Sequence, residues 1–171
     1  MKKIRGKKIT YSIQRKHLPN GRVVDIDVIE HPGAALIVPC FDDGKIIFLR
    51  QYRAVFGRYL FELPAGTLDR EEKALNCAKR ELIEETGYAA KRWVKLGKIY
   101  PVPGYSTEVI YIFKAEGLRR QEAEKDFDEV IEPIILTRQQ IRKLFQKGQI
   151  LDAKTICALA LGGWLSPLNR R

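Results

Sequence analysis

The sequence has few of the features that mark secreted, disulfide-bonded or membrane proteins. Its three cysteines, Cys40, Cys77 and Cys157, lie far apart among apolar residues, which favours reduced, buried thiols over disulfides or a C-x-x-C metal site. No apolar run reaches about 18 residues, the length that a transmembrane helix requires. The basic start, MKKIRGKKITYSIQRK, lacks the apolar core of a signal peptide. These absences predict a cytoplasmic protein with no membrane partner.

Repeats, low-complexity tracts and internal linkers are also missing, and what remains is typical of a folded protein. The 171 residues are 45% hydrophobic and 30% charged, with a net charge of +10. Such a charge suits either a well-solvated surface or attraction to a polyanion. Apart from KKIRGKK near the start, the positive residues are dispersed. A nucleic acid is therefore not expected as the partner.

The order of the predicted elements indicates an α+β sandwich with a mixed sheet. Asn20-Gly21 is a strong hairpin signal between two N-terminal strands. Thr137 and Asp152 are expected to cap two C-terminal helices. Strands are expected at 8–14, 22–31, 34–41, 45–53, 59–66, 93–100, 108–116 and 130–136, helices at 71–86, 138–148 and 153–163, and a polar loop at 119–129.

The helix expected at 71–86 concentrates negative charge in a basic chain. At 100° per residue, Glu81, Glu84 and Glu85 share one stripe beside the apolar face, and Gly87 ends the helix. Arg80 reaches Glu84 at i+4, but one arginine cannot balance three carboxylates. A solvated helix face is the alternative interpretation. Because Mg²⁺ prefers oxygen ligands and substrate phosphates, the cluster predicts a metal-assisted phosphoryl or pyrophosphoryl reaction.

The stretch GTLDREEKALNCAKRELIEETGY, residues 66–88, resembles the signature of the Nudix hydrolases. That signature has a glycine, five residues, a glutamate, seven residues and then R-E-U-x-E-E-x-G-U, where U is bulky and aliphatic. Only Tyr88, in the last U position, departs from it. The resemblance implies an α/β/α sandwich that hydrolyses nucleoside diphosphates linked to another moiety.

The resemblance also implies residue roles. Two or three Mg²⁺ ions, with Mn²⁺ as the alternative, are expected in the active site. The expected metal ligands are Glu81, Glu84, Glu85 and the carbonyl of Ala65. Arg80 is expected to orient the glutamates, and Glu72 to bind metal or brace the motif.

The flanking segments RQYR, ELPAG, EHPGAALIVP and PVPGYSTE resemble the ADP-ribose pyrophosphatase group. Arg53 is then expected to clamp phosphate, since a guanidinium pairs bidentately with phosphate oxygens. Pro103 and Gly104 are expected to shape a loop near the ribose, and Glu108 to accept bonds from its hydroxyls. The implied reaction is hydrolysis of ADP-ribose to AMP and ribose 5-phosphate. A nucleotide sugar or dinucleoside polyphosphate is the alternative substrate.

A base for the attacking water is expected in the acidic loop EKDFDEVIE. Glu129 is the candidate, with Glu85 as the alternative. Relatives in this group are homodimers that exchange N-terminal strands, so the chain is divided into an arm, 1–33, and a hydrolase domain, 34–171. Asp27 or its neighbour Ile26 is expected to touch adenine bound to the other subunit.

Overall fold

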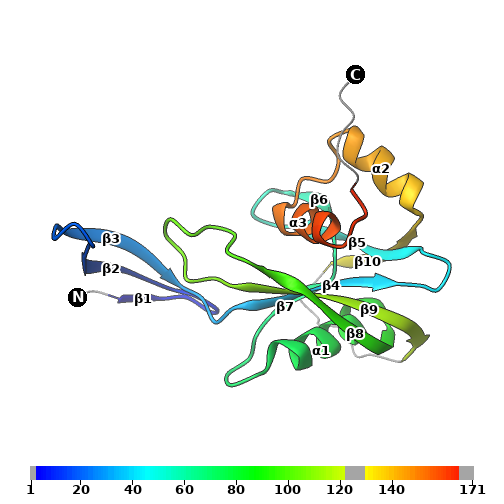
Figure 1. The fold of residues 1–171 in the computed structure, drawn as a ribbon, viewed down its shortest axis with the longest axis horizontal. Coiled ribbons are helices and arrows are strands. Elements are labelled where there is room, and N and C mark those ends of the chain that lie inside the picture. Colours follow the sequence, from blue (N-terminus) through cyan, green and yellow to red (C-terminus); the bar gives the residue numbers. More distant parts are fainter. Residues whose placement is uncertain (1–2, 122–129, 166–171) are drawn as a thin grey trace.

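The computed structural model describes residues 3–121 and 130–165 and has the α+β architecture that the sequence predicts (Figure 1). The expected strands and helices follow one another in the expected order, with β1 in addition and the segment 59–66 divided between β6 and β7. The elements are β1 (Lys3–Arg5), β2 (Thr10–His17), β3 (Val23–Glu30), β4 (Ala34–Cys40), β5 (Ile46–Arg53), β6 (Arg58–Glu62), β7 (Ala65–Thr67), α1 (Ala74–Thr86), β8 (Tyr88–Ile99), β9 (Ile110–Arg120), β10 (Ile131–Leu136), α2 (Arg138–Gln146) and α3 (Ala153–Leu161). Within the described ranges, no helix is long and apolar enough to cross a membrane.

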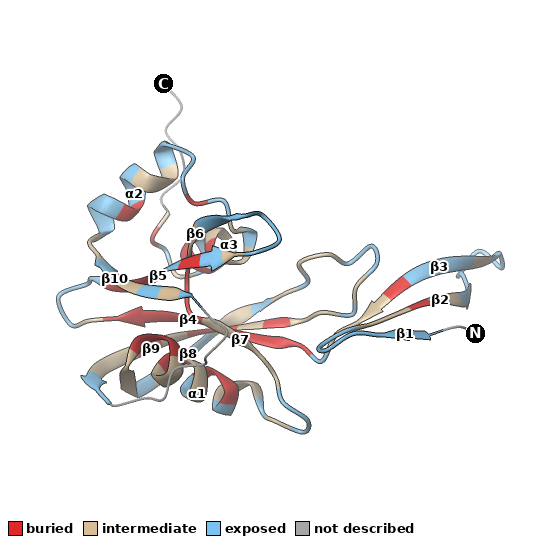
Figure 2. Cartoon of the chain, turned by 180° about the vertical axis from the view of Figure 1, so that it is seen from behind, coloured by how far each residue is buried: buried red, intermediate tan, exposed pale blue. Residues whose placement is uncertain are grey.

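The central sheet is mixed and lies between two helical layers. Its strand order is β10-β5-β4-β9-β8, with β6 paired to β5 and β7 paired to β4. Strands β4 and β9 run parallel, whereas the other neighbours in this sheet are antiparallel. Figures 1 and 2 show α1 on one face of the sheet and α2 and α3 on the other. The predicted α/β/α sandwich is therefore confirmed.

Strand β4 forms the middle of the core because all seven of its residues are buried. Alternate side chains of a strand point to opposite faces. Leu36 and Val38 pack into the cluster that includes residues of α2 and α3, and Ala35 and Ile37 pack against α1. A strand buried on both faces reads as a continuous apolar run, as AALIVPC does.

An N-terminal antiparallel sheet projects from the body of the molecule (Figure 1). The predicted hairpin is present as β2 and β3, which pair along eight residues. Gly21 closes its turn with φ +80°, a conformation that glycine adopts without strain. Strand β1 is an additional strand that the sequence did not predict, and it pairs with the start of β2. The division at residue 33 falls between β3 and β4 and stays a prediction.

Helix α1 starts at Ala74, three residues later than predicted. Glu71 has φ 62°, a left-handed conformation that a helix cannot include. In the turn before the helix, the Asp69 N–H donates to the Glu72 carboxylate at 3.0 Å. The predicted end is correct: Gly87 has φ 73°, and its N–H donates to the carbonyl of Ile83.

Both C-terminal helices begin as predicted. Thr137 caps α2 in a reciprocal capping box with Gln140. Asp152 caps α3 by accepting a hydrogen bond from the N–H of Thr155. The Thr155 hydroxyl in turn accepts from the Leu63 N–H at 2.9 Å. The cap therefore attaches the start of α3 to the segment between β6 and β7.

Candidate active site

Strand β7 and helix α1 place the signature residues next to each other. Glu85 is 6% exposed, and its Oε2 accepts a hydrogen bond from the Ala65 N–H at 2.8 Å. In an extended strand, a residue's N–H and C=O point to the same edge. The carbonyl of Ala65, which the sequence predicted as a metal ligand, therefore faces the same side as the Glu85 carboxylate.

Arg80 connects the other signature glutamates. Its Nη1 donates to Glu81 at 2.7 Å and to Glu84 at 2.9 Å. Its Nε and Nη2 donate to Glu72 at 3.2 and 3.0 Å. The bond to Glu72 and the charge of Glu81 raise the pKa of Arg80, and the same guanidinium lowers the pKa of Glu72. The expected i,i+4 contact with Glu84 is present, together with two contacts that spacing alone did not indicate.

Gly66 leaves the space that Glu81 occupies. A Cβ built on Gly66 would lie 1.7 Å from Oε1 and 1.8 Å from Cδ of Glu81. Any side chain at position 66 would thus displace the Glu81 carboxylate from its place beside Arg80. The first glycine of the signature is required here by close packing rather than by a positive φ.

The donors of this cluster fit a hard divalent cation. They are carboxylate oxygens and a backbone carbonyl, the ligand types that Mg²⁺ and Mn²⁺ accept. In residues 3–121 and 130–165, no three His, Cys, Asp or Glu side chains form a ready metal-holding group in this conformation. Arg80 lies among Glu72, Glu81 and Glu84, where it compensates part of their charge.

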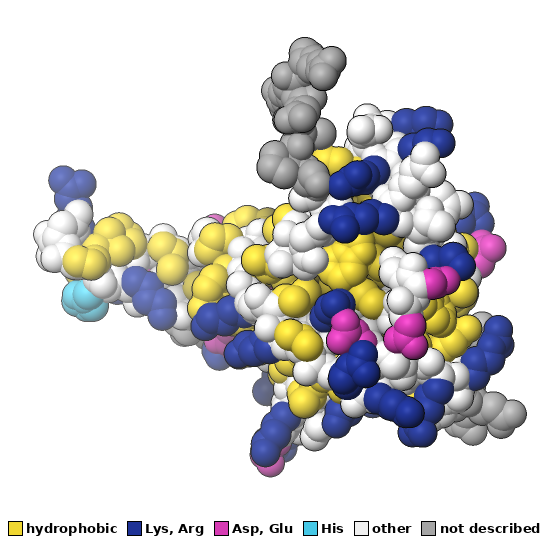
Figure 3. Space-filling view, turned by 45° about the vertical axis from the view of Figure 1, so that its right-hand side comes forward, with side chains coloured by type: hydrophobic (Ala, Val, Ile, Leu, Met, Phe, Trp, Pro, Cys, Tyr) yellow, Lys and Arg dark blue, Asp and Glu magenta, His cyan; other side chains and the backbone are white. Residues whose placement is uncertain are grey.

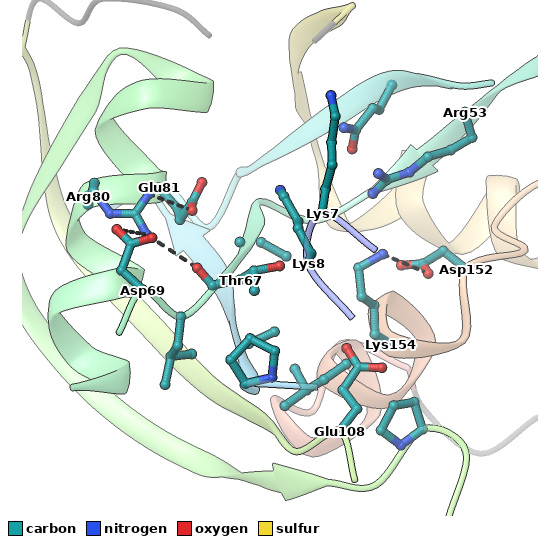
Figure 4. Close-up of a pocket in the computed structure, with 18 of the residues that line it drawn as sticks. Lys7, Lys8, Arg53, Thr67, Asp69, Arg80, Glu81, Glu108, Asp152 and Lys154 are labelled. Carbon is teal, nitrogen blue, oxygen red and sulfur yellow. Dashed lines mark hydrogen bonds and ion pairs between the residues drawn. The ribbon is translucent and has the colours of Figure 1, made fainter. Parts of the chain in front are cut away.

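A cleft of about 860 Å³ opens beside these residues (Figure 4). It has the size of a typical small-molecule site. The residues that line it are Lys7, Lys8, Pro32, Ala34, Gln51, Arg53, Ala65, Gly66, Thr67, Leu68, Asp69, Arg70, Arg80, Glu81, Pro101, Glu108, Ile110, Asp152, Ala153 and Lys154. Six are Lys or Arg and four are Asp or Glu, so the lining itself favours an anionic ligand.

In the cleft wall opposite α1, two cationic side chains bind the buried carboxylate of Glu62. Glu62 is 1% exposed and accepts two hydrogen bonds from Arg53, at 2.7 and 2.6 Å, and one from Lys154. Burial raises the pKa of Glu62, but Arg53 and Lys154 outweigh burial and lower it overall. Lys154 also contacts Asp152, the cap of α3, at 2.9 Å. Sequence reasoning missed Glu62, Asp152 and Lys154 as site residues, although a glutamate inside the apolar run YLFEL is an unusual feature.

Of the residues predicted to bind the substrate, some line the cleft and others do not. Arg53 lines the cleft, but two of its nitrogens already bind Glu62. Glu108 lines the cleft with His31 Nε2 at 3.9 Å. Pro103 and Gly104 are exposed in the β8–β9 loop and do not line it.

The remaining predicted residues, Asp27, Ile26 and Glu129, lie away from the cleft or outside the described residues. Asp27 is on the N-terminal sheet, where it accepts a hydrogen bond from the Tyr11 hydroxyl at 2.5 Å. Its neighbour Ile26 is exposed on the same strand. Glu129 and the other acidic residues before it in the predicted loop, Glu124, Asp126 and Asp128, lie outside the described residues.

Comparison with known proteins decides the family. The family model for the NUDIX domain matches residues 30–159, most of the chain. The chain belongs to the Nudix family. The match covers β7, α1 and the strands around the cleft.

Two of the similar proteins are named as pyrophosphatases. An ADP-ribose pyrophosphatase of Bacillus subtilis (strain 168) is 37% identical, with 90% of this chain and 84% of the relative covered. A GDP-mannose pyrophosphatase of Shigella flexneri serotype 5b (strain 8401) is 33% identical, covering 88% and 83%. A crystal structure of an ADP compounds hydrolase has a TM-score of 0.80 and 25% identity, covering 94% of this chain and 87% of that one.

Proposed function

We propose that this Nudix protein hydrolyses the pyrophosphate of ADP-ribose, giving AMP and ribose 5-phosphate, with Mg²⁺ as the cofactor. The observation that carries the proposal is the meeting of a carboxylate-bearing helix and a cation-lined cleft at one site. The likeness to an ADP-ribose pyrophosphatase and to an ADP compounds hydrolase supports the choice of substrate.

Glu81, Glu84, Glu85 and the Ala65 carbonyl are proposed to hold two or three Mg²⁺ ions, with Mn²⁺ as the alternative. When bound, these cations supply positive charge to the pyrophosphate and lower the pKa of the attacking water. Arg80 holds Glu81 and Glu84 in position through its 2.7 and 2.9 Å bonds. Most N–H donors of Arg80 already face carboxylates, so its proposed role is to position the glutamates.

The proton of the attacking water is proposed to go to Glu129, with Glu85 as the alternative base. The assignment of Glu129 as the base rests on the sequence alone. Glu85 is held by the Ala65 N–H and is 6% exposed, so it lies where bulk water is largely excluded. A Glu129→Gln variant with a wild-type rate would move the base to Glu85.

Glu108 is proposed to accept hydrogen bonds from ribose hydroxyls, because its carboxylate lines the cleft near the end of the β8–β9 loop. Pro103 and Gly104 are proposed to act on the ribose through that loop. Arg53 is proposed to act on phosphate only through the N–H donors that Glu62 leaves available, which include both on Nη1. Asp27 is proposed to contact adenine in the second subunit of a dimer.

We propose that two chains form a homodimer through the N-terminal sheet. Figure 3 shows apolar side chains along this projecting element. Its exposed large apolar residues, with those of its turns, are Ile4, Ile9, Ile13, Leu18, Val23 and Ile26. A group of such side chains on one exposed sheet favours a covering protein surface. The test is to measure the mass in solution by light scattering coupled to size-exclusion chromatography. We expect the mass of two chains, and the mass of one chain would contradict the proposed homodimer.

A cytoplasmic location is proposed from the thiols. Cys40, Cys77 and Cys157 are all free. Free thiols persist in reducing compartments. Burial also raises the pKa of Cys40 and of Cys77 to about 12, so these two thiols stay protonated at neutral pH.

The second candidate function is hydrolysis of GDP-mannose, which the GDP-mannose pyrophosphatase relatives favour. The test is to incubate the protein with Mg²⁺ and ADP-ribose, and separately with GDP-mannose, NADH and diadenosine polyphosphate, and to identify the products. The proposal expects preference for ADP-ribose, release of AMP and loss of activity on chelation. Preference for GDP-mannose would retain the metal helix and overturn the substrate assignment.

A further inference from the structure

The turn between β1 and β2 places two lysines in the cleft. Gly6 N–H donates to the Ile9 carbonyl at 2.8 Å and closes a tight turn whose tip is Lys7-Lys8. Both lysines line the cleft, although they belong to the projecting N-terminal sheet. Figure 4 shows them between the wall that carries Arg80 and Glu81 and the wall that carries Arg53 and Lys154.

The other cations of the cleft already have carboxylate partners. Arg80 contacts the signature glutamates, and Arg53 and Lys154 contact Glu62. Arg70, the remaining cation of the lining, lies 3.6 Å from the neighbouring Glu71.

Lys7 and Lys8 differ from these four cations. Within residues 3–121 and 130–165, no hydrogen bond or ion pair joins either ammonium group to another side chain. Both side chains are exposed. Among the described residues, Lys7 and Lys8 thus carry the positive charge of the cleft lining that no carboxylate compensates.

We propose that Lys7 and Lys8 bind the pyrophosphate of the substrate and supply the phosphate contact that the sequence assigned to Arg53. An ammonium group offers three donors on a flexible stem, so it can follow a phosphate oxygen without a fixed geometry. Arg53, by contrast, would have to leave a buried carboxylate to make a bidentate phosphate pair. The inference rests on the proposed function only for the identity of the molecule that carries the pyrophosphate.

The first experiment compares two double variants on the same small sheet. Lys7→Gln/Lys8→Gln removes the charges of the tip. Lys16→Gln/Arg22→Gln removes two charges at the opposite end, where the side chains are exposed and away from the cleft. Both variants lower the net charge by two, so a general loss of attraction affects them equally.

For ADP-ribose with Mg²⁺, the tip variant is expected to raise KM about tenfold, with kcat within about twofold, because exposed charge pairs contribute modest binding energy each. KM of the tip variant should also depend less on salt than KM of the wild type. The control variant is expected to keep wild-type KM. Lys7→Arg/Lys8→Arg is expected to restore KM, since the charge and not the fold of the turn is needed. Equal KM values in the tip and control variants would overturn the inference.

The second experiment removes the dependence on substrate identity. Calorimetry measures binding of inorganic pyrophosphate in the presence of Mg²⁺ to the wild type and to both double variants. Affinity is expected to fall about tenfold in the tip variant alone. If the protein hydrolyses no ADP-ribose, the proposed function fails, and this measurement still decides the inference. Unchanged pyrophosphate affinity in the tip variant, or no binding by the wild type, would refute it.

Discussion

The Glu62→Gln substitution tests whether the buried carboxylate fixes the basic wall of the cleft. Glutamine keeps the size of glutamate but removes its charge. Glu62 is 1% exposed, whereas its partners Arg53 and Lys154 are 37% and 19% exposed. The substitution leaves two cations facing a neutral amide, whose NH₂ group cannot accept a hydrogen bond.

The expected loss of stability follows from the bonds that are lost. Three charge-assisted hydrogen bonds end on Glu62, each contributing about 1.5–3 kcal/mol when buried. Breaking a fully buried ion pair costs about 3–5 kcal/mol. Because Arg53 is more than one-third exposed, solvent screens part of its contribution. We therefore expect a loss of about 2–3 kcal/mol, which lowers Tm by roughly 4–12 °C in a domain of this size.

Glu132→Gln is the matched control, since Glu132 also bonds an arginine on β5. The distance from Arg50 Nη1 to Glu132 Oε2 is 3.1 Å, but these side chains are 46% and 61% exposed. Such a pair contributes little, so Tm should change by no more than about 1 °C. Thermal unfolding followed by circular dichroism compares the two variants. Equal Tm values would refute the argument.

The effect of Glu62→Gln on stability should also depend on pH, in a direction that the pKa of Glu62 determines. The folded-state pKa of Glu62 is lowered from 4.5. Its contribution is therefore complete above about pH 4.5 and is lost as the pH falls through the folded-state value. The difference in stability between wild type and Glu62→Gln should shrink in that acidic range. A difference that grows on acidification would contradict the assigned charge state.

Three further outcomes are expected. Glu85→Gln should abolish turnover with a nearly unchanged melting curve, because the amide oxygen can still accept from the Ala65 N–H; activity in the folded variant would refute the assigned role. Gly66→Ala should weaken metal binding, measured by Mn²⁺ calorimetry, because its Cβ displaces Glu81; wild-type metal affinity would show that the carboxylate can be held elsewhere. Chelation with EDTA should remove pyrophosphate binding as well as turnover, and binding that survives chelation would show that the protein's own cations suffice.

Local patterns predicted the elements that have strong periodicity or clear caps. They failed where pairing partners decide the structure. Strand β8 was expected from Trp93 but starts at Tyr88, and β9 continues to Arg120, since these two residues pair with each other. Both ends are too polar or too small to indicate strands alone, and only the long antiparallel ladder stabilises them. Strand β1 was missed for a similar reason, because three residues are too short for an alternation to be visible.

The signature side of the site could be predicted because its residues are close in sequence and share one helix. Glu81, Glu84 and Glu85 need only the period of the helix to be placed together. The opposite wall depends on residues that are distant in sequence: Lys154 meets Glu62 across 92 positions. Sequence alone therefore assigned Arg53 to phosphate and left its buried partner unnoticed.

The formal charges around the cleft explain why an anion needs added cations there. The lining carries two more positive than negative residues. Five further glutamates contact that lining and reverse the balance to three negative charges: Glu62, Glu71, Glu72, Glu84 and Glu85. These local charges would thus repel a pyrophosphate in the cleft, even with Lys7 and Lys8 in place and although the chain carries a net charge of +10. Two divalent cations on the α1 wall would make the site positive, so binding and catalysis should depend on the same ions.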